Sequence, residues 1–226
     1  MANNFDQLTR SVVLGDDASP VRQRFLDEYS AEVSAFVTEM ATAFDTWDRL
    51  SSKIGYEFDA AHLSALVYSA LHNHVLSMKL LLEGLMVAAG NAQRFTLESI
   101  AMALLASNRS LDFLQRYSAG KYSTSKAIRD LRRNAAILGL DKIAIVQLEE
   151  QSKFYDQYSH PTLLTVASLI TLGGPDSETV FGSVFDDGKR NAYGKEINSR
   201  IGLASVLPNF MQGVEENFLR GVRRQR

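Results

Sequence analysis

Proline is the strongest helix breaker, and it occurs at only four of the 226 positions of the chain. Long stretches without a breaker separate Pro20, Pro161, Pro175 and Pro208. Through those stretches apolar residues recur three and four positions apart, the pattern of a helix with one buried face. The sequence therefore predicts an all-α fold, a bundle of long antiparallel helices around one core.

The apolar spacing predicts about seven helices. Their approximate ranges are 19–50, 60–89, 91–117, 123–138, 141–156, 161–172 and 191–223. We expect Gly90-Asn91 to end the second helix and Gly139 to cap the fourth. Asp141 is the expected N-cap of the fifth helix. The one extended segment that we expect is short and lies within 179–185.

No linker rich in glycine and serine divides the chain, and no repeat of fixed period is present. We therefore expect one domain over 1–226. Its parts would be an N-terminal arm (1–18), a core bundle (19–172), a loop (173–190) and a C-terminal helix (191–226). A chain of this length can bury enough surface to fold without a disulfide or a structural metal.

Several classes of function are excluded by what the sequence lacks. Without cysteine there is no zinc–thiolate site, iron–sulfur cluster or cysteine nucleophile. The motifs GxxxxGK[ST], GxGxxG, HExxH and GxSxG are also absent. The start of the chain has no signal-peptide character, and no apolar stretch is long enough to span a bilayer. We expect a soluble cytoplasmic protein with no membrane contact, no metal and no cofactor.

The net charge is only −2, but basic residues are concentrated in one segment. Residues 109–133 carry seven basic and two acidic side chains. Lys126, Arg129, Arg132 and Arg133 fall on one predicted helix, which could bind the phosphates of RNA or of a nucleotide. Alternatively, the acidic N-terminal region neutralises this segment, within one chain or across a dimer.

A row of charges interrupts the apolar helix predicted at 91–117. Arg94 and Glu98 are four residues apart and share a helix face, and Arg109 follows about three turns later on the same face. Two interpretations are open. The row forms an ion-pair network that locks the helix in register, or part of it lines a binding pocket between helices.

The segment Lys153–Thr162 has the highest density of candidate functional groups. Pro161 disfavours helical geometry in the preceding residue, so His160 should lie at a junction between two helices. His160 could transfer a proton while Lys153 balances phosphate charge, with Tyr155 and Ser159 nearby, as in metal-independent RNA cleavage. The alternative is that Ser159 and His160 cap a helix while the tyrosines pack.

The other histidines favour a structural interpretation. His72 and His74 are two residues apart on a helix, so their side chains point to different faces and do not easily share a metal ion. His74 lies near the apolar stripe. We expect it to be a core histidine with a hydrogen-bond partner.

Two stretches together resemble the HEPN-like helical superfamily, in its uncharacterised and abortive-infection-type bacterial branch. They are Gly90–Leu105, with its arginine followed by glutamate, and Tyr155–Thr162, with its Ser-His-Pro sequence. The resemblance covers about residues 60–172. It implies a helical bundle that often forms a homodimer through its histidine-bearing helices. In active members it implies a ribonuclease of toxin or phage-defence systems.

Active members carry an arginine four to six residues ahead of the histidine, where this chain offers only Lys153. Lysine cannot make the bidentate phosphate contact of arginine. The sequence therefore predicts a non-catalytic binding module in stress or phage defence, with a nucleic acid, a nucleotide or a protein as partner. The alternative is a metal-independent ribonuclease that uses His160.

Overall fold

The computed structural model describes residues 19–171 and 179–223. These residues form an all-α bundle, as predicted, with one two-stranded sheet. The α-helices are α2 (Ser19–Ile54), α3 (Phe58–Leu82), α4 (Met86–Ala106), α5 (Phe113–Ser118), α6 (Ala127–Arg133), α7 (Ala135–Leu138), α8 (Lys142–Asp156), α9 (Leu163–Ser168) and α10 (Arg190–Arg223). Short 3-10 helices are η1 (Arg109–Leu111), η2 (Thr124–Lys126), η3 (Gln157–Ser159) and η4 (Asp187–Lys189).

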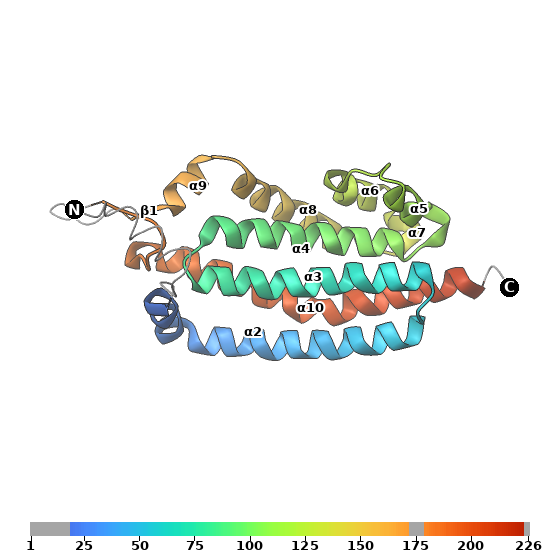
Figure 1. The fold of residues 1–226 in the computed structure, drawn as a ribbon, viewed down its shortest axis with the longest axis horizontal. Helices are drawn as coiled ribbons and strands as arrows, with labels where there is room; N and C mark the ends of the chain where they lie inside the picture. Colours follow the sequence, from blue (N-terminus) through green and yellow to red (C-terminus); the bar gives the residue numbers. More distant parts are fainter. Residues whose placement is uncertain (1–18, 172–178, 224–226) are drawn as a thin grey trace, which may run out of the picture.

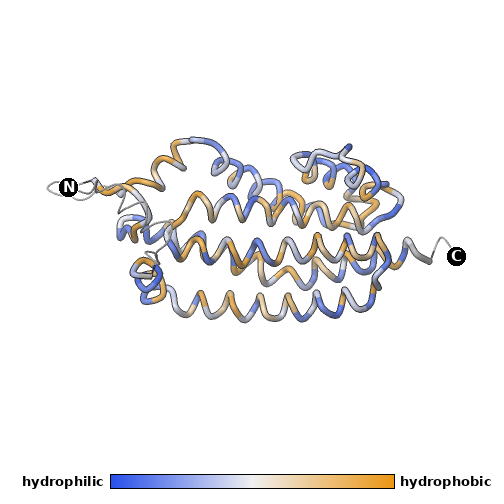
Figure 2. Tube along the Cα trace, viewed as in Figure 1, coloured by the Kyte–Doolittle hydropathy of each residue, from blue (hydrophilic) through white to orange (hydrophobic). Residues whose placement is uncertain are grey.

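Four long helices, α2, α3, α4 and α10, run along the length of the molecule (Figure 1). The chain passes back and forth from α2 through α3 to α4, and α10 packs mainly against α2. The shorter helices α5 to α9 cover the side of α4 that faces away from α2 (Figure 1). Apolar positions recur along α3 and α4, the two central helices (Figure 2).

Helices α2 and α10 are parallel neighbours, which two contacts far apart along the pair demonstrate. Arg190 donates to Glu28 at one end, and Lys53 donates to Glu215 at the other. The sequence separation is 162 residues in both contacts, so the register is constant along the pair. Near its start α2 bends at Tyr29, whose backbone is not helical (φ −127°, ψ 28°).

Three predicted boundaries of the second and third helices are wrong. The helix expected over 60–89 ends at Leu82, because Gly84 adopts a left-handed conformation (φ 75°) that only glycine takes up without strain. Helix α4 begins two residues later, so Gly90 lies inside a helix and does not end one. The helix expected over 91–117 stops at Ala106 and resumes only as α5.

The second half of the chain has shorter elements than predicted. The helix expected over 123–138 is divided into η2, α6 and α7, although Gly139 caps it in the left-handed conformation (φ 66°) as predicted. Asp141 is the predicted N-cap of α8 and accepts from the amide of Ile143. The helix expected over 161–172 is only α9, capped by Thr162 and followed by β1 (Ile170–Thr171).

Strand β1 pairs with β2 (Val180–Phe181), which falls within the predicted extended segment. Helix α10 continues across Pro208 as a single helix. The predicted arm 1–18, residues 172–178, where the predicted core bundle passes into the predicted loop, and the last residues 224–226 lie outside the described residues. None of the helices within 19–171 and 179–223 combines the length and apolar character needed to cross a membrane.

Candidate functional site

Arg94 of α4 joins the two stretches on which the family resemblance rests. Its Nε lies 3.1 Å from Glu98 on the same helix, and its Nη1 donates to the Ser159 hydroxyl at 2.6 Å. Its Nη2 lies 3.4 Å from the carboxylate of Asp156 at the end of α8. The structure therefore brings the predicted residues Arg94, Glu98 and Ser159 together, with all three guanidinium nitrogens in contact with groups of this chain.

The tyrosines of the junction pack beneath this ion pair. Tyr158 lies against Gly90, and the Asn91 side chain donates to the Tyr158 carbonyl at 3.2 Å. Tyr155 is buried, and its hydroxyl donates to Glu196 of α10 at 2.9 Å. Burial raises the pKa of Tyr155 to about 12. At neutral pH the phenol stays protonated and acts as a donor that holds α8 against α10.

The predicted proton carrier, His160, lies where the helix is interrupted. Its backbone is extended (φ −133°, ψ 154°), as expected for a residue before proline. Its carbonyl accepts from the Thr162 amide at 2.8 Å and the Thr165 hydroxyl at 3.0 Å. The imidazole is exposed, and so is the side chain of Lys153. Neither side chain has a hydrogen bond or ion pair with another described residue.

Arg109 does not continue the row of Arg94 and Glu98. Because α4 ends at Ala106, Arg109 lies in η1 at the far end of that helix. There its guanidinium lies 3.7 Å from the carboxylates of both Glu57 and Asp59, and 5.0 Å above the ring of Phe218. These contacts place Arg109 at the end of the bundle, away from the junction.

The predicted basic helix is η2 followed by α6, and acidic side chains accompany three of its four candidate cations. Arg132 lies 3.4 Å from Glu149 of α8. Arg133 and Arg129 lie 3.5 and 3.8 Å from Asp130. Lys126, in η2, is exposed. Contacts on this face therefore neutralise part of its positive charge within the chain.

A buried polar network behind the junction was not predicted. Arg200 of α10 is only 1 % exposed. Its Nε donates to Ser77 of α3 at 2.8 Å, and its Nη1 donates to the Glu196 carboxylate at 2.6 Å. A charge inside the bundle is tolerated because it is paired and hydrogen-bonded. The sequence signal was present, since Arg200 interrupts the regular apolar repeat of the last helix.

His74 is the core histidine that the sequence predicted, and it belongs to the same network. Its Nδ1 lies 2.9 Å from Gln93 of α4, and its Nε2 lies 2.9 Å from the carbonyl of Arg200. Burial lowers the pKa of His74 to about 4, so the ring is neutral at neutral pH. The neutral ring donates from Nε2 to that carbonyl and links α3 to α10.

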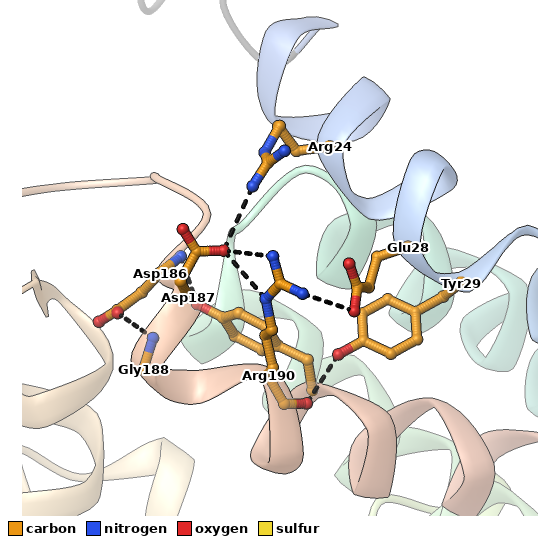
Figure 3. A network of polar contacts seen from close by, with 8 residues as sticks. Arg24, Glu28, Tyr29, Asp186, Asp187, Gly188 and Arg190 are labelled. Atoms are coloured by element: carbon orange, nitrogen blue, oxygen red, sulfur yellow. Dashed lines mark hydrogen bonds and ion pairs between the residues drawn. The ribbon is translucent and has the colours of Figure 1, made fainter.

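A second polar cluster lies where η4 and the start of α10 meet the first turns of α2 (Figure 3). Arg190 lies 2.8 Å from Asp187 and 2.9 Å from Glu28, and Arg24 reaches the same Asp187 at 3.2 Å. The hydrogen bond from Arg190 lowers the pKa of Asp187. Tyr29, at the bend of α2, donates to the Arg190 carbonyl at 2.7 Å. This cluster fastens η4 and the start of α10 to α2.

Among the described residues, no three histidine or carboxylate side chains converge in a way that could hold a metal ion. Comparisons of the chain with protein-family models, with curated proteins and with solved structures found no match. The resemblance to the HEPN-like superfamily therefore stays a prediction.

Proposed function

We propose that this chain is a non-catalytic binding module whose partner is a protein, and first of all a second copy of itself. One contrast supports the proposal. The cations predicted to bind phosphate, Arg94, Arg129, Arg132 and Arg133, lie beside carboxylates of this chain, whereas large apolar side chains are exposed on α9 and β2. Paired cations weaken the case for nucleic acid, and exposed apolar groups favour a protein partner.

The exposed apolar residues form what we call the α9–hairpin patch. Its members are Leu163 (89 % exposed), Phe181 (73 %), Leu169 (50 %), Val166 (46 %) and Val180 (43 %). They come from neighbouring elements, because β1 follows α9 directly and the Gly182 amide donates to the Leu169 carbonyl at 3.0 Å. Exposed apolar side chains gathered on neighbouring elements are a common feature of protein–protein interfaces.

The test is the mass in solution of the wild type and of the double variant Leu163→Glu/Phe181→Glu. Size-exclusion chromatography with light scattering should give the wild type about twice the 25.1 kDa chain mass, and the variant the chain mass itself. Val206→Glu changes a residue that is 49 % exposed on α10 and should remain dimeric. A monomeric wild type would reject the second copy as partner.

One observation supports the alternative, a metal-independent ribonuclease. The exposed His160 directly follows Ser159, which accepts a hydrogen bond from Arg94. Total RNA and tRNA should be incubated with the protein in EDTA, beside His160→Ala and Lys153→Ala. We expect no cleavage by any of the three. Cleavage by the wild type that is lost in His160→Ala would establish the enzyme and overturn the non-catalytic proposal.

A further inference from the structure

A cavity of about 340 Å³ opens between the last turns of α2 and the first turns of α3. Three aromatic side chains line it: Trp47 from α2, Tyr56 from the connecting loop and Tyr68 from α3. Small side chains of α3, among them Ala61 and Ala65, also line it. The volume is within the range of small-molecule sites.

The orientation of two of the three rings follows from their contacts with neighbouring groups. The indole N–H of Trp47 donates to the Ser64 carbonyl at 3.1 Å, which fixes the orientation of the ring. Trp47 and Tyr68 have their centroids 5.0 Å apart at an angle of 48°, so they form two inclined walls. Tyr56 is 86 % exposed, an unusual position for a large aromatic residue in a monomer.

The cavity offers few hydrogen-bonding groups to a ligand. The hydroxyls of Ser51 and Ser64, which both line it, are hydrogen-bonded to each other. The remaining wall is carbon and aromatic surface. Such a wall does not suit a sugar or a phosphate, which need several donors. It does suit a ligand that is recognised by aromatic faces.

The charge around the cavity is negative. Asp48 follows Trp47 on α2, is exposed and has no ion-pair partner among the described residues. Glu57, next to Tyr56, has a side chain that is 85 % exposed, with its carboxylate 3.7 Å from Arg109. Of the nearby cations, Lys53 is paired with Glu215 of α10, and Arg49 is exposed and donates to the Asp45 carbonyl and the Thr46 hydroxyl of its own helix. A cation would therefore be attracted to this end of the bundle, and an anion repelled.

We propose that this aromatic cavity binds a compact methylated ammonium group, the trimethylammonium head of a small molecule such as choline. The positive methyl shell would lie against the faces of Trp47, Tyr56 and Tyr68, and Asp48 would supply long-range attraction. Quaternary ammonium groups are recognised in this way because the ring faces carry partial negative charge and no hydrogen bond is required. The cavity is separate from the α9–hairpin patch, so either proposal can fail alone.

Trp47 is the only tryptophan of the chain, so its fluorescence reports directly on the cavity. The protein is titrated with choline chloride and, separately, with 3,3-dimethylbutan-1-ol, in which a neutral tert-butyl group replaces trimethylammonium. Sodium chloride at equal ionic strength is the control for salt. Choline should change the Trp47 emission saturably and bind at least about tenfold more tightly than its neutral isostere.

Two variants test the rings. Tyr56→Leu removes an exposed ring without a cost in folding and should weaken choline binding about fivefold or more. Phe95→Leu removes a ring that is 51 % exposed on α4, outside the cavity, and should bind choline like the wild type. Equal affinity for choline and its isostere, or unchanged binding in Tyr56→Leu, would overturn the proposal. So would the absence of any saturable change with choline.

Discussion

Replacing Gly90 with alanine should destabilise the protein, although the same change stabilises most helices. Gly90 is buried in the second turn of α4, under the ring of Tyr158. In a helix interior, alanine is favoured over glycine by about 0.5–1 kcal/mol, because it loses less backbone entropy on folding. A change at Gly90 with only this effect would raise the free energy of unfolding.

Because Tyr158 packs against Gly90, we expect the free energy of unfolding to fall and not to rise. A Cβ atom at position 90 would lie 2.3 Å from Cγ and 2.5 Å from Cδ2 of the tyrosine. Carbon atoms in contact lie about 3.5–4.0 Å apart, so the ring must retreat by more than about 1 Å. Tyr158 is only 4 % exposed, and displacing it disturbs its contact with Tyr155. Overpacking of this kind costs about 1–3 kcal/mol, and loss of the buried ring costs about 3 kcal/mol. We expect Gly90→Ala to lower the free energy of unfolding by about 1–3 kcal/mol.

Urea unfolding followed by circular dichroism measures the effect. Gly202→Ala and Gly213→Ala are matched controls, since both glycines lie inside α10 with no atom near a new Cβ, and both should stabilise. In a Tyr158→Ala background the clash partner is gone, so Gly90→Ala should again be stabilising. The reasoning is refuted if Gly90→Ala in the wild type stabilises as much as Gly202→Ala does.

Three further predictions concern the polar contacts. His74, whose pKa burial lowers from 6.5 to about 4, contributes stability that is complete above about pH 6.5 and is lost as the pH falls toward 4, by about 3 kcal/mol at most. Urea unfolding at several pH values should show that slope, and His74→Gln should flatten it; an identical slope in the variant would contradict the assignment. Arg200→Met leaves the Glu196 carboxylate, 11 % exposed, without its ion-pair partner and should cost about 3–5 kcal/mol, of which Glu196→Gln in the same chain recovers part. A neutral Arg200→Met would show that the network is dispensable. Arg94→Lys cannot contact Glu98, Asp156 and Ser159 together and should cost about 1 kcal/mol in urea unfolding. Arg132→Lys, at a side chain that is 69 % exposed, should change stability by less than about 0.5 kcal/mol, and equal effects of the two would reject the special role of Arg94.

The apolar spacing predicted the long helices because their buried faces recur regularly, and it missed the places where one residue ends a helix. Gly84 lies in an apolar run that is otherwise helical, and only its left-handed conformation reveals the end of α3. Gly90 is also a glycine, but it lies inside α4 and does not end a helix. Its function is to leave space for a ring 68 residues further along the chain, which local spacing cannot show.

The candidate site was predicted in part for a similar reason. Arg94 and Glu98 are neighbours on one helix, so their pairing follows from the sequence. Ser159 as a further partner of Arg94 depends on how α8 lies across α4. Arg200 could have been found from sequence alone. It takes one place in the repeat of buried residues Tyr193, Ile197, Arg200, Ala204, Leu207, Met211, Val214 and Phe218. A charge in such a repeat predicts a buried ion pair.

The parallel pairing of α2 with α10 has a consequence for synthesis on the ribosome. Helices α3 and α4 can pack as a hairpin as soon as both have emerged, because their contacts are local in sequence. Helix α2 cannot complete its packing until α10 follows, more than a hundred residues later. Until then His74 and Ser77 of α3 lack the backbone carbonyl and guanidinium of Arg200. The nascent chain therefore carries an open apolar groove until α10 has been made, and a ribosome that stalls before Arg200 holds a substrate for chaperones and proteases.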